Sequence, residues 1–296
     1  GLAGGQFLLP VAEPGGMDLF ALVAVLVSVA VVPMCLSASK TPDFDEPERL
    51  TFRQLYKASP LGSFGIFATG LTQGTFFGFG SVYAQEAGFS LKEISIFMAL
   101  AIVGGMISQL PLGRLSDRID RRVVIASAAT GSAISAFVAL TLLTPADGAD
   151  VPIWPLMVTI TIFGAFCMPL YSLCIAHVAD HVSARQMVSA SAALVFLGGC
   201  GAIVGPNVTG VLMTEFGPQG FFVPLTAASA LIAAFALFRM TRRAAPTDEQ
   251  QVDFVTIPPR ASPYAAQLAP DATDDDESTE EEEDAEATDA VQAAGL

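Results

Sequence analysis

The residues with the clearest chemical pattern lie in one short stretch, Gly113–Arg122, which reads GRLSDRIDRR. Its acid Asp117 stands among arginines, and a carboxylate there can accept hydrogen bonds from a helix N-terminus or pair with a guanidinium. Gly113 can end a helix and turn the backbone. Apolar segments flank the stretch on both sides. It therefore predicts a charge cluster that holds one arrangement of two helices and releases it in another.

The elements that carry this stretch are long and apolar. A transmembrane helix needs about 20 predominantly apolar residues. The segments that meet or approach this length are Asp18–Leu36, Leu61–Ala84, Ile94–Leu112, Val123–Leu143, Ile153–Val178, Val188–Met213 and Phe221–Met240. Before them, Gly1–Leu9 is too short to span and is interpreted as the end of a helix. The sequence thus predicts an all-α membrane protein with about seven complete transmembrane helices.

Composition agrees with a lipid environment. Of the 296 residues, 52% are hydrophobic and only 15% are charged, against about 25% in an average soluble domain. The formal net charge is −15, but 12 acidic residues without any Lys or Arg lie between Asp271 and Asp289. The acidity therefore describes a tail, which we expect to be disordered. No basic patch indicates nucleic acid.

The basic residues predict the orientation. Of 14 Lys and Arg, 12 flank alternate connections on one side, while Lys92 stands alone on the other side and Arg260 lies in the tail. The positive-inside rule then places the Gly113–Arg122 connection and the C-terminal tail in the cytoplasm. We expect a multi-pass protein of a bacterial inner membrane.

The loop resembles the signature of the major facilitator superfamily, Gly-x-Leu-[Ala/Ser]-Asp-Arg-x-Gly-Arg-Arg. Asp120 departs from it, because the family usually has glycine there. The resemblance implies a cytoplasmic gate and alternating-access transport of a small solute without a cofactor. The matching residues are Gly113, Leu115, Ser116, Asp117, Arg118, Arg121 and Arg122.

The family carries this loop after helix 2 and, in degenerate form, after helix 8. Helix count, orientation and the long connection before Leu61 favour the second copy. The chain then corresponds to helices 6–12 of twelve, and we expect most of the N-terminal half of its parent to be missing. The divisions are 1–9, end of helix 5; 10–38, periplasmic turn and helix 6; 39–59, cytoplasmic inter-half linker; 60–243, six-helix bundle; 244–296, acidic cytoplasmic tail.

Polar residues within the predicted spans are candidates for lining a solute path, because the resemblance implies a cavity near the bilayer midplane. Each could instead form an interhelical hydrogen bond. These candidates are Thr72, Gln73, Tyr83, Gln109, Tyr171 and Asn207. His177 is interpreted as an interfacial residue beside Asp180 and His181.

Small residues predict close helix contacts, in the ladders Gly70/Gly74/Gly78 and Gly201/Gly205. Gly205, Pro206 and Gly210 predict a local kink. Cys35, Cys167, Cys174 and Cys200 fit no disulfide or metal pattern and are interpreted as packing residues.

Two other classes of function stay open. One is a non-transporting membrane sensor or assembly protein that works through its acidic tail. The other is a membrane enzyme, which the sequence disfavours because no metal-ligand cluster and no nucleophile–base arrangement is evident.

Overall fold

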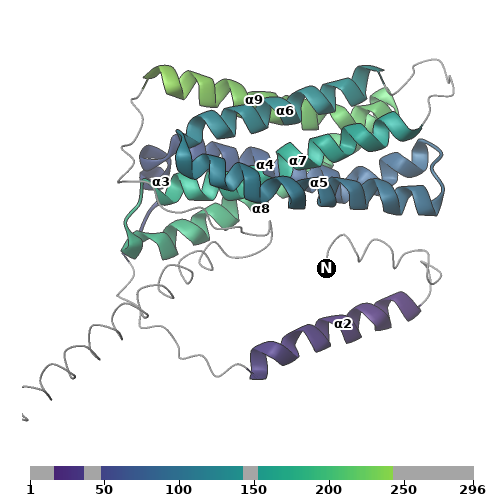
Figure 1. Cartoon of the computed structure of the whole chain (residues 1–296), viewed down its shortest axis with the longest axis horizontal. Helices are drawn as coiled ribbons and strands as arrows, with labels where there is room; N and C mark the ends of the chain where they lie inside the picture. The colour runs from purple at the N-terminus through teal and green to yellow at the C-terminus, as the bar shows by residue number, and fades with distance from the viewer. Residues whose placement is uncertain (1–16, 37–47, 143–152, 243–296) are drawn as a thin grey trace, which may run out of the picture.

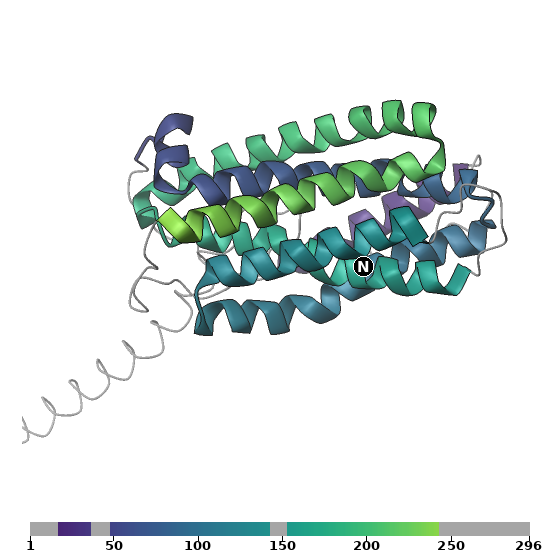
Figure 2. The same cartoon turned by 90° about the horizontal axis from the view of Figure 1, so that it is seen from above.

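The computed structural model describes residues 17–36, 48–142 and 153–242, and no strand occurs within these ranges. Figures 1 and 2 show α4 to α9 running lengthwise side by side in one bundle, with α3 at one end. The elements are α2 (Met17–Leu36), α3 (Phe52–Ala58), α4 (Pro60–Glu86), α5 (Leu91–Arg118), α6 (Arg121–Leu142), α7 (Ile153–Ala179), α8 (Ala184–Phe216), the 3₁₀ turn η2 (Pro218–Phe221) and α9 (Phe222–Arg242). The predicted segment 1–9 and the tail 244–296 lie outside the described residues.

Local signals explain where several helices begin and end. Ser90 opens α5 with a capping box, because its hydroxyl and the Glu93 carboxylate each satisfy a backbone N–H of the other residue. Pro60 occupies the first turn of α4, where a missing N–H costs nothing. Gly217 follows α8 with φ +74°, a conformation that favours glycine. These caps produce the sharp turns that fold the spans back on one another.

Five described helices, α5 to α9, have both the length and the composition to cross a membrane, against seven predicted spans. Helix α4 has 27 residues but a less apolar sequence, rich in glycine and threonine. It packs against α7, α8 and α9, so neighbouring helices shield much of its surface. Helix α2 offers only a shorter apolar stretch, Phe20–Val32, and Figure 1 shows it apart from the bundle.

Two pairs of parallel helices pack backbone to backbone. In the α4–α8 pair, a Cβ added at Gly70 would collide with the Gly198 backbone. In the α5–α7 pair, a Cβ at Gly104 would collide with the Thr161 carbonyl. The predicted α4 and α8 ladders are thus confirmed as contacts. In lipid, such close approach is a main source of helix association, since burying apolar side chains gains little there.

In both pairs, a proline leaves the backbone carbonyl four residues before it without its helical hydrogen bond, and the partner helix lies against that residue. Pro169 has no N–H to donate to the carbonyl of Ala165, four residues earlier, and the Ser108 hydroxyl of α5 donates to that oxygen instead. Pro206 likewise frees the carbonyl of Ala202, and Gly74 of α4 lies against this residue. Helix α8 continues through Pro206 without interruption. The partner helix therefore accommodates each proline.

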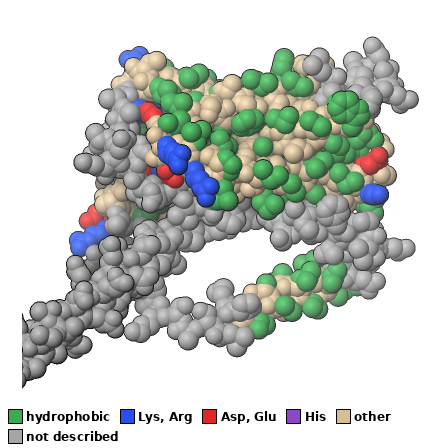
Figure 3. Space-filling view, viewed as in Figure 1, with side chains coloured by type: hydrophobic (Ala, Val, Ile, Leu, Met, Phe, Trp, Pro, Cys, Tyr) green, Lys and Arg blue, Asp and Glu red, His purple; other side chains and the backbone are tan. Residues whose placement is uncertain are grey.

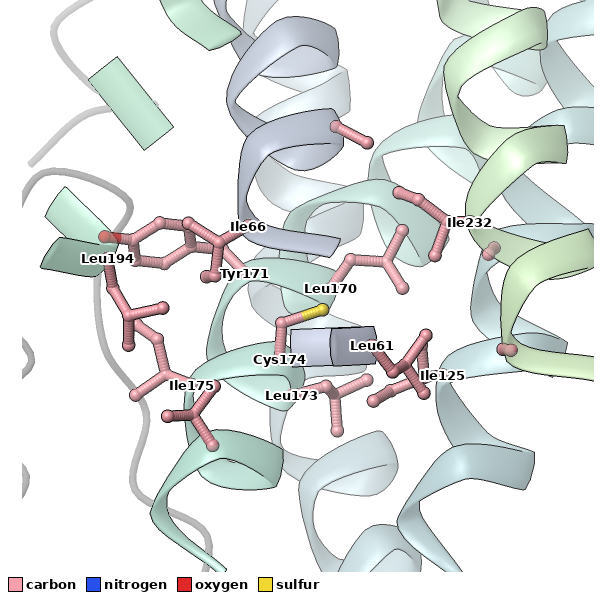
Figure 4. Close-up of a cluster of buried hydrophobic side chains, with 14 of the residues drawn as sticks. Leu61, Ile66, Ile125, Leu170, Tyr171, Leu173, Cys174, Ile175, Leu194 and Ile232 are labelled. Atoms are coloured by element: carbon pink, nitrogen blue, oxygen red, sulfur yellow. The ribbon is translucent and has the colours of Figure 1, made fainter. Parts of the chain in front are cut away.

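Two apolar clusters fill the bundle. One surrounds Leu170, Leu173 and Cys174 of α7 and extends to Ile66 and Tyr171, as Figure 4 shows. The other is aromatic and lies toward the start of α5 and the end of α4. Cys167 and Cys174 are buried and Cys200 is partly buried, all without a disulfide, in agreement with a packing role. The side chain of Cys35 lies outside the description.

The described end of the predicted linker is attached to the bundle. The Glu48 backbone donates to the Arg185 carbonyl at 3.1 Å and accepts from the Ser189 hydroxyl at 2.7 Å. Leu55 of α3 is fully buried. Residues 48–59 therefore dock against the start of α8 and the beginning of α4.

Candidate functional site: the charge cluster at the α5–α6 end

A buried arginine joins three helices where α5 ends and α6 begins. The Arg121 side chain, 2% exposed, reaches Asp117 of α5 at 2.9 Å through Nη2. Through Nη1 it reaches Asp180, just beyond α7, at 2.7 Å. The Asp180 side chain is 1% exposed and that of Asp117 is 28% exposed. Separating a buried charge pair leaves each charge without compensation, so this cluster holds the three helix ends together.

Asp120, which departs from the signature, has a clear structural role. Its carboxylate accepts from the Arg122 backbone N–H at 2.9 Å and therefore caps the N-terminus of α6. It also accepts from Nε and Nη2 of Arg122 at 2.8 to 3.2 Å. Burial raises the pKa of the Asp120 carboxyl, but these hydrogen bonds and the Arg122 charge outweigh that effect and hold the pKa below its ordinary value. A glycine at this position has no side chain and could neither cap α6 in this way nor pair with Arg122.

The expectation that Gly113 ends a helix is wrong. Helix α5 continues to Arg118, and the turn to α6 consists of Ile119 and Asp120 alone. Gly113 is buried within the helix, and its carbonyl accepts from the Ser116 hydroxyl at 2.7 Å. Leu115 and Arg118 lie on exposed positions of the same helical end. The chain turns later because the helical hydrogen bonds continue until Ile119 adopts an extended conformation.

Two histidines lie next to this cluster. Ligand atoms of His177, Asp180 and His181 lie within 4.8 Å of one another. We expected no metal-ligand cluster from the sequence, although the spacing His-x-x-Asp-His at the end of a helix is a signal for one. His177 is 4% exposed and lies in the last turn of α7, beside Asp180 and His181.

The candidate path residues on α4 differ in their surroundings. Gln73 is 7% exposed and its Nε2 has no hydrogen-bond partner among the described residues. Thr72 donates to the Thr69 carbonyl at 2.9 Å and contacts Cys167 of α7. The Tyr83 ring stacks on the Phe221 ring within the aromatic cluster, with the ring centroids 4.9 Å apart. Gln73 thus keeps an unused donor, whereas Thr72 and Tyr83 have packing partners.

The remaining candidates lie on α5, α7 and α8. The Gln109 amide donates to the Ser172 hydroxyl of α7 at 3.3 Å. Tyr171 is 5% exposed and contacts the first apolar cluster. Asn207 is exposed and donates to the Ile203 carbonyl at 2.7 Å.

Asn207 also lines an open groove between α4 and α8 with a volume of about 480 Å³. Glu215 contributes a carboxylate to this groove. Gly205, by contrast, is buried against the Leu71 carbonyl of α4. The other lining residues are Phe79, Pro206, Gly210, Val211 and Thr214.

The charged side chains are unevenly distributed along the bundle. Figure 3 shows most of the visible Lys and Arg at one end of the bundle and fewer at the other, while Asp and Glu occur at both ends. Lys92 at the start of α5 lies at the opposite end from Arg114 and Arg118. The predicted segregation of basic residues is therefore present in the fold.

A comparison with family models decides the classification. The model described as "Major Facilitator Superfamily" matches residues 62–270, more than half of the chain. The chain belongs to the Major Facilitator Superfamily. The signature loop, the apolar helices and this match agree that it is a multi-pass membrane protein of a transporter family.

The curated relatives of this chain are named only as members of the superfamily. An "Uncharacterized MFS-type transporter" from Yersinia enterocolitica is 26% identical over 87% of the chain and 63% of its own length. The "Uncharacterized MFS-type transporter YcaD" from Escherichia fergusonii is 25% identical over 76% of the chain and 56% of its own length. The chain thus spans about three fifths of the length of these relatives. No solved structure gave a significant match.

Proposed function

We propose that this chain forms part of a secondary transporter that moves a small solute across a bacterial inner membrane by alternating access. The observation that carries the proposal is Arg121, buried between Asp117 and Asp180 in the signature loop of a transporter superfamily. Helices α4 to α9 correspond to helices 7–12 of this proposed transporter and α2 to its helix 6. The α5–α6 end and the tail face the cytoplasm, as the distribution of basic residues favours.

The charge cluster acts in this proposal as a latch on the cytoplasmic side. Opening that side moves the start of α6 away from the end of α7, so the Arg121–Asp180 pair must break. A pair with both side chains almost fully buried resists this separation more than an exposed pair does. Solute binding and closure of the opposite end supply the free energy that opens the latch.

The proposed solute path runs past Gln73 of α4, Gln109 of α5 and Asn207 of α8. The Gln73 amide is the strongest candidate for a direct solute contact, because its buried donor has no partner among the described residues and a solute group could satisfy it. We propose that the N-terminal half of the parent protein completes this path, as in transporters built from two repeats.

Thiol labelling in bacterial membrane vesicles tests alternating access. Asn207→Cys places a reactive thiol in the groove. Its labelling by an impermeant maleimide added from the outer face is measured, and the labelling of the chain without this substitution is subtracted. Asp180→Asn releases the latch, favours opening of the cytoplasmic end and closes the groove, so labelling of Cys at position 207 should fall.

The control for this experiment is Gln85→Cys, an exposed position at the end of α4. Its labelling should not respond to Asp180→Asn. If Asp180→Asn does not fold, Asp117→Asn serves in its place, because the Asp117 side chain is more exposed. Unchanged labelling at position 207 in a folded latch variant contradicts the proposal.

The sensor or assembly alternative predicts a different dependence. Removal of residues 244–296 would abolish the function of such a protein, while substitution of Asp117 would leave it intact. A transporter should keep its function without residues 244–296 and should lose function when Asp117 is substituted.

A further inference from the structure

The two histidines of this chain lie one helical turn apart at the end of α7. They are the only histidines among the 296 residues. Their rings are in edge-to-face contact, with centroids 4.7 Å apart. Histidines at positions i and i+4 on one helix face form a frequent metal-chelating pair, because both imidazoles project to the same side.

The hydrogen bond of His181 engages Nδ1 and leaves Nε2 available for a metal. Its Nδ1 lies 2.8 Å from the His177 backbone carbonyl, which can only accept. Nδ1 therefore carries the proton, and Nε2 of the neutral ring keeps a lone pair. A ring N–H held by a backbone carbonyl is one of the arrangements that orient histidine ligands in metal sites.

Asp180 supplies an oxygen ligand close to the two rings. The three donor atoms lie within 4.8 Å of one another, whereas donors on one tetrahedral zinc ion are about 3.4 Å apart. Small side-chain rotations close this difference.

We propose that His177, Asp180 and His181 form a binding site for a divalent transition-metal ion of the Zn²⁺ class. Two imidazole nitrogens and one carboxylate oxygen suit this class better than Mg²⁺ or Ca²⁺, which prefer oxygen ligands alone. With three protein ligands, the site keeps a position open for water or another small ligand.

The site shares Asp180 with the arginine cluster. A metal ion that takes the Asp180 carboxylate competes with Arg121 Nη1, which now lies 2.7 Å from that oxygen. Metal binding therefore weakens the connection of α6 to the end of α7. This consequence rests on the proposed latch, whereas the binding site itself does not.

Metal binding to the purified full chain, stripped with a chelator, tests the proposal. Zn²⁺ affinity is measured by calorimetry in detergent, and nitrogen coordination by electron paramagnetic resonance with Cu²⁺. The wild type should bind one Zn²⁺ tightly and show nitrogen hyperfine structure in excess of any terminal-amine signal. His181→Gln should weaken this binding at least about tenfold and remove part of the nitrogen signal.

Two further variants sharpen the test. Asp180→Asn should weaken Zn²⁺ binding while the nitrogen signal of Cu²⁺ persists. Ser183→Gln is the matched control, since Ser183 is exposed, lies two residues from His181 and makes no side-chain cap bond. Its affinity should equal that of the wild type.

Binding through the acidic tail or through cysteine thiols would show a different result. Wild type and His181→Gln would then have the same Zn²⁺ affinity and the same Cu²⁺ spectrum, which overturns the proposal. An equal loss in Ser183→Gln would also overturn it, because the effect would then be a local disturbance of the helix end. His181 is only partly buried, so its variant should fold, and thermal unfolding without metal checks this.

Discussion

Arg121 Nη1 lies 2.7 Å from Asp180 Oδ1, although 59 residues separate the two in the chain. Both side chains are almost completely withdrawn from solvent. Asp117 shares the same guanidinium from the preceding helix but is more exposed. The pair is therefore the central contact of the cluster, and Asp117 is its outer member.

The two aspartates should differ in their contribution to stability. Asp180→Asn leaves the buried Arg121 charge poorly compensated and should lower the free energy of unfolding by about 3–5 kcal/mol. Asp117→Asn removes a partly exposed partner and should cost about 1 kcal/mol or less. Denaturant unfolding in detergent measures both. Equal losses would show that burial does not distinguish the two ion pairs.

The close helix pairs predict a sharp contrast between glycines. Gly70→Ala and Gly104→Ala place a Cβ against backbone atoms of the partner helix and should each cost about 1–3 kcal/mol. Gly199→Ala is the control, because nothing lies within 4 Å of an added Cβ there. This variant should be neutral or slightly stabilising, since alanine favours a helix over glycine. Thermal unfolding measures the stability of the three variants. Equal changes in stability would refute the assigned contacts.

The Ser108 hydroxyl should be coupled energetically to Pro169. Ser108→Ala removes the donor that satisfies the Ala165 carbonyl and should cost about 1 kcal/mol. In a Pro169→Ala background, the new N–H at position 169 can serve that carbonyl, so the same substitution should cost less. A double-mutant cycle measures this difference. Strict additivity would mean that the two residues act independently.

Gln73 should show opposite effects on stability and transport. Gln73→Leu replaces a buried amide that has an unpartnered donor, so the free energy of unfolding should stay equal or rise by about 1 kcal/mol. If Gln73 contacts the solute, transport by the parent protein should fall at the same time. Thr72→Val on the neighbouring face is the control and should reduce stability more than transport. Loss of stability in Gln73→Leu would indicate a hidden partner for the amide.

Five helices that are long and apolar enough to cross a membrane were predictable from the sequence, because apolar length is a local property of the chain. Cap residues such as Ser90 also act within one turn, so the start of α5 lies close to its predicted position. The signature loop indicated the superfamily from ten consecutive residues, and the family comparison confirmed it. Helix count was less certain, because the glycines and threonines that let α4 pack between other helices also lower its hydropathy.

The partners of polar residues required the tertiary structure. Gly113 belongs to the helix rather than to the turn, and Asp120 caps α6, because the end of α5 is decided by hydrogen bonds that continue past the glycine. The pairing of Arg121 with Asp180 depends on α7 folding back beside α5, which residue types alone do not specify. The same packing left Gln73 Nε2 without a partner while Thr72, one residue away, contacts Cys167. Local pattern thus indicated the long apolar helices, and only the packing of distant helices decided which polar groups meet.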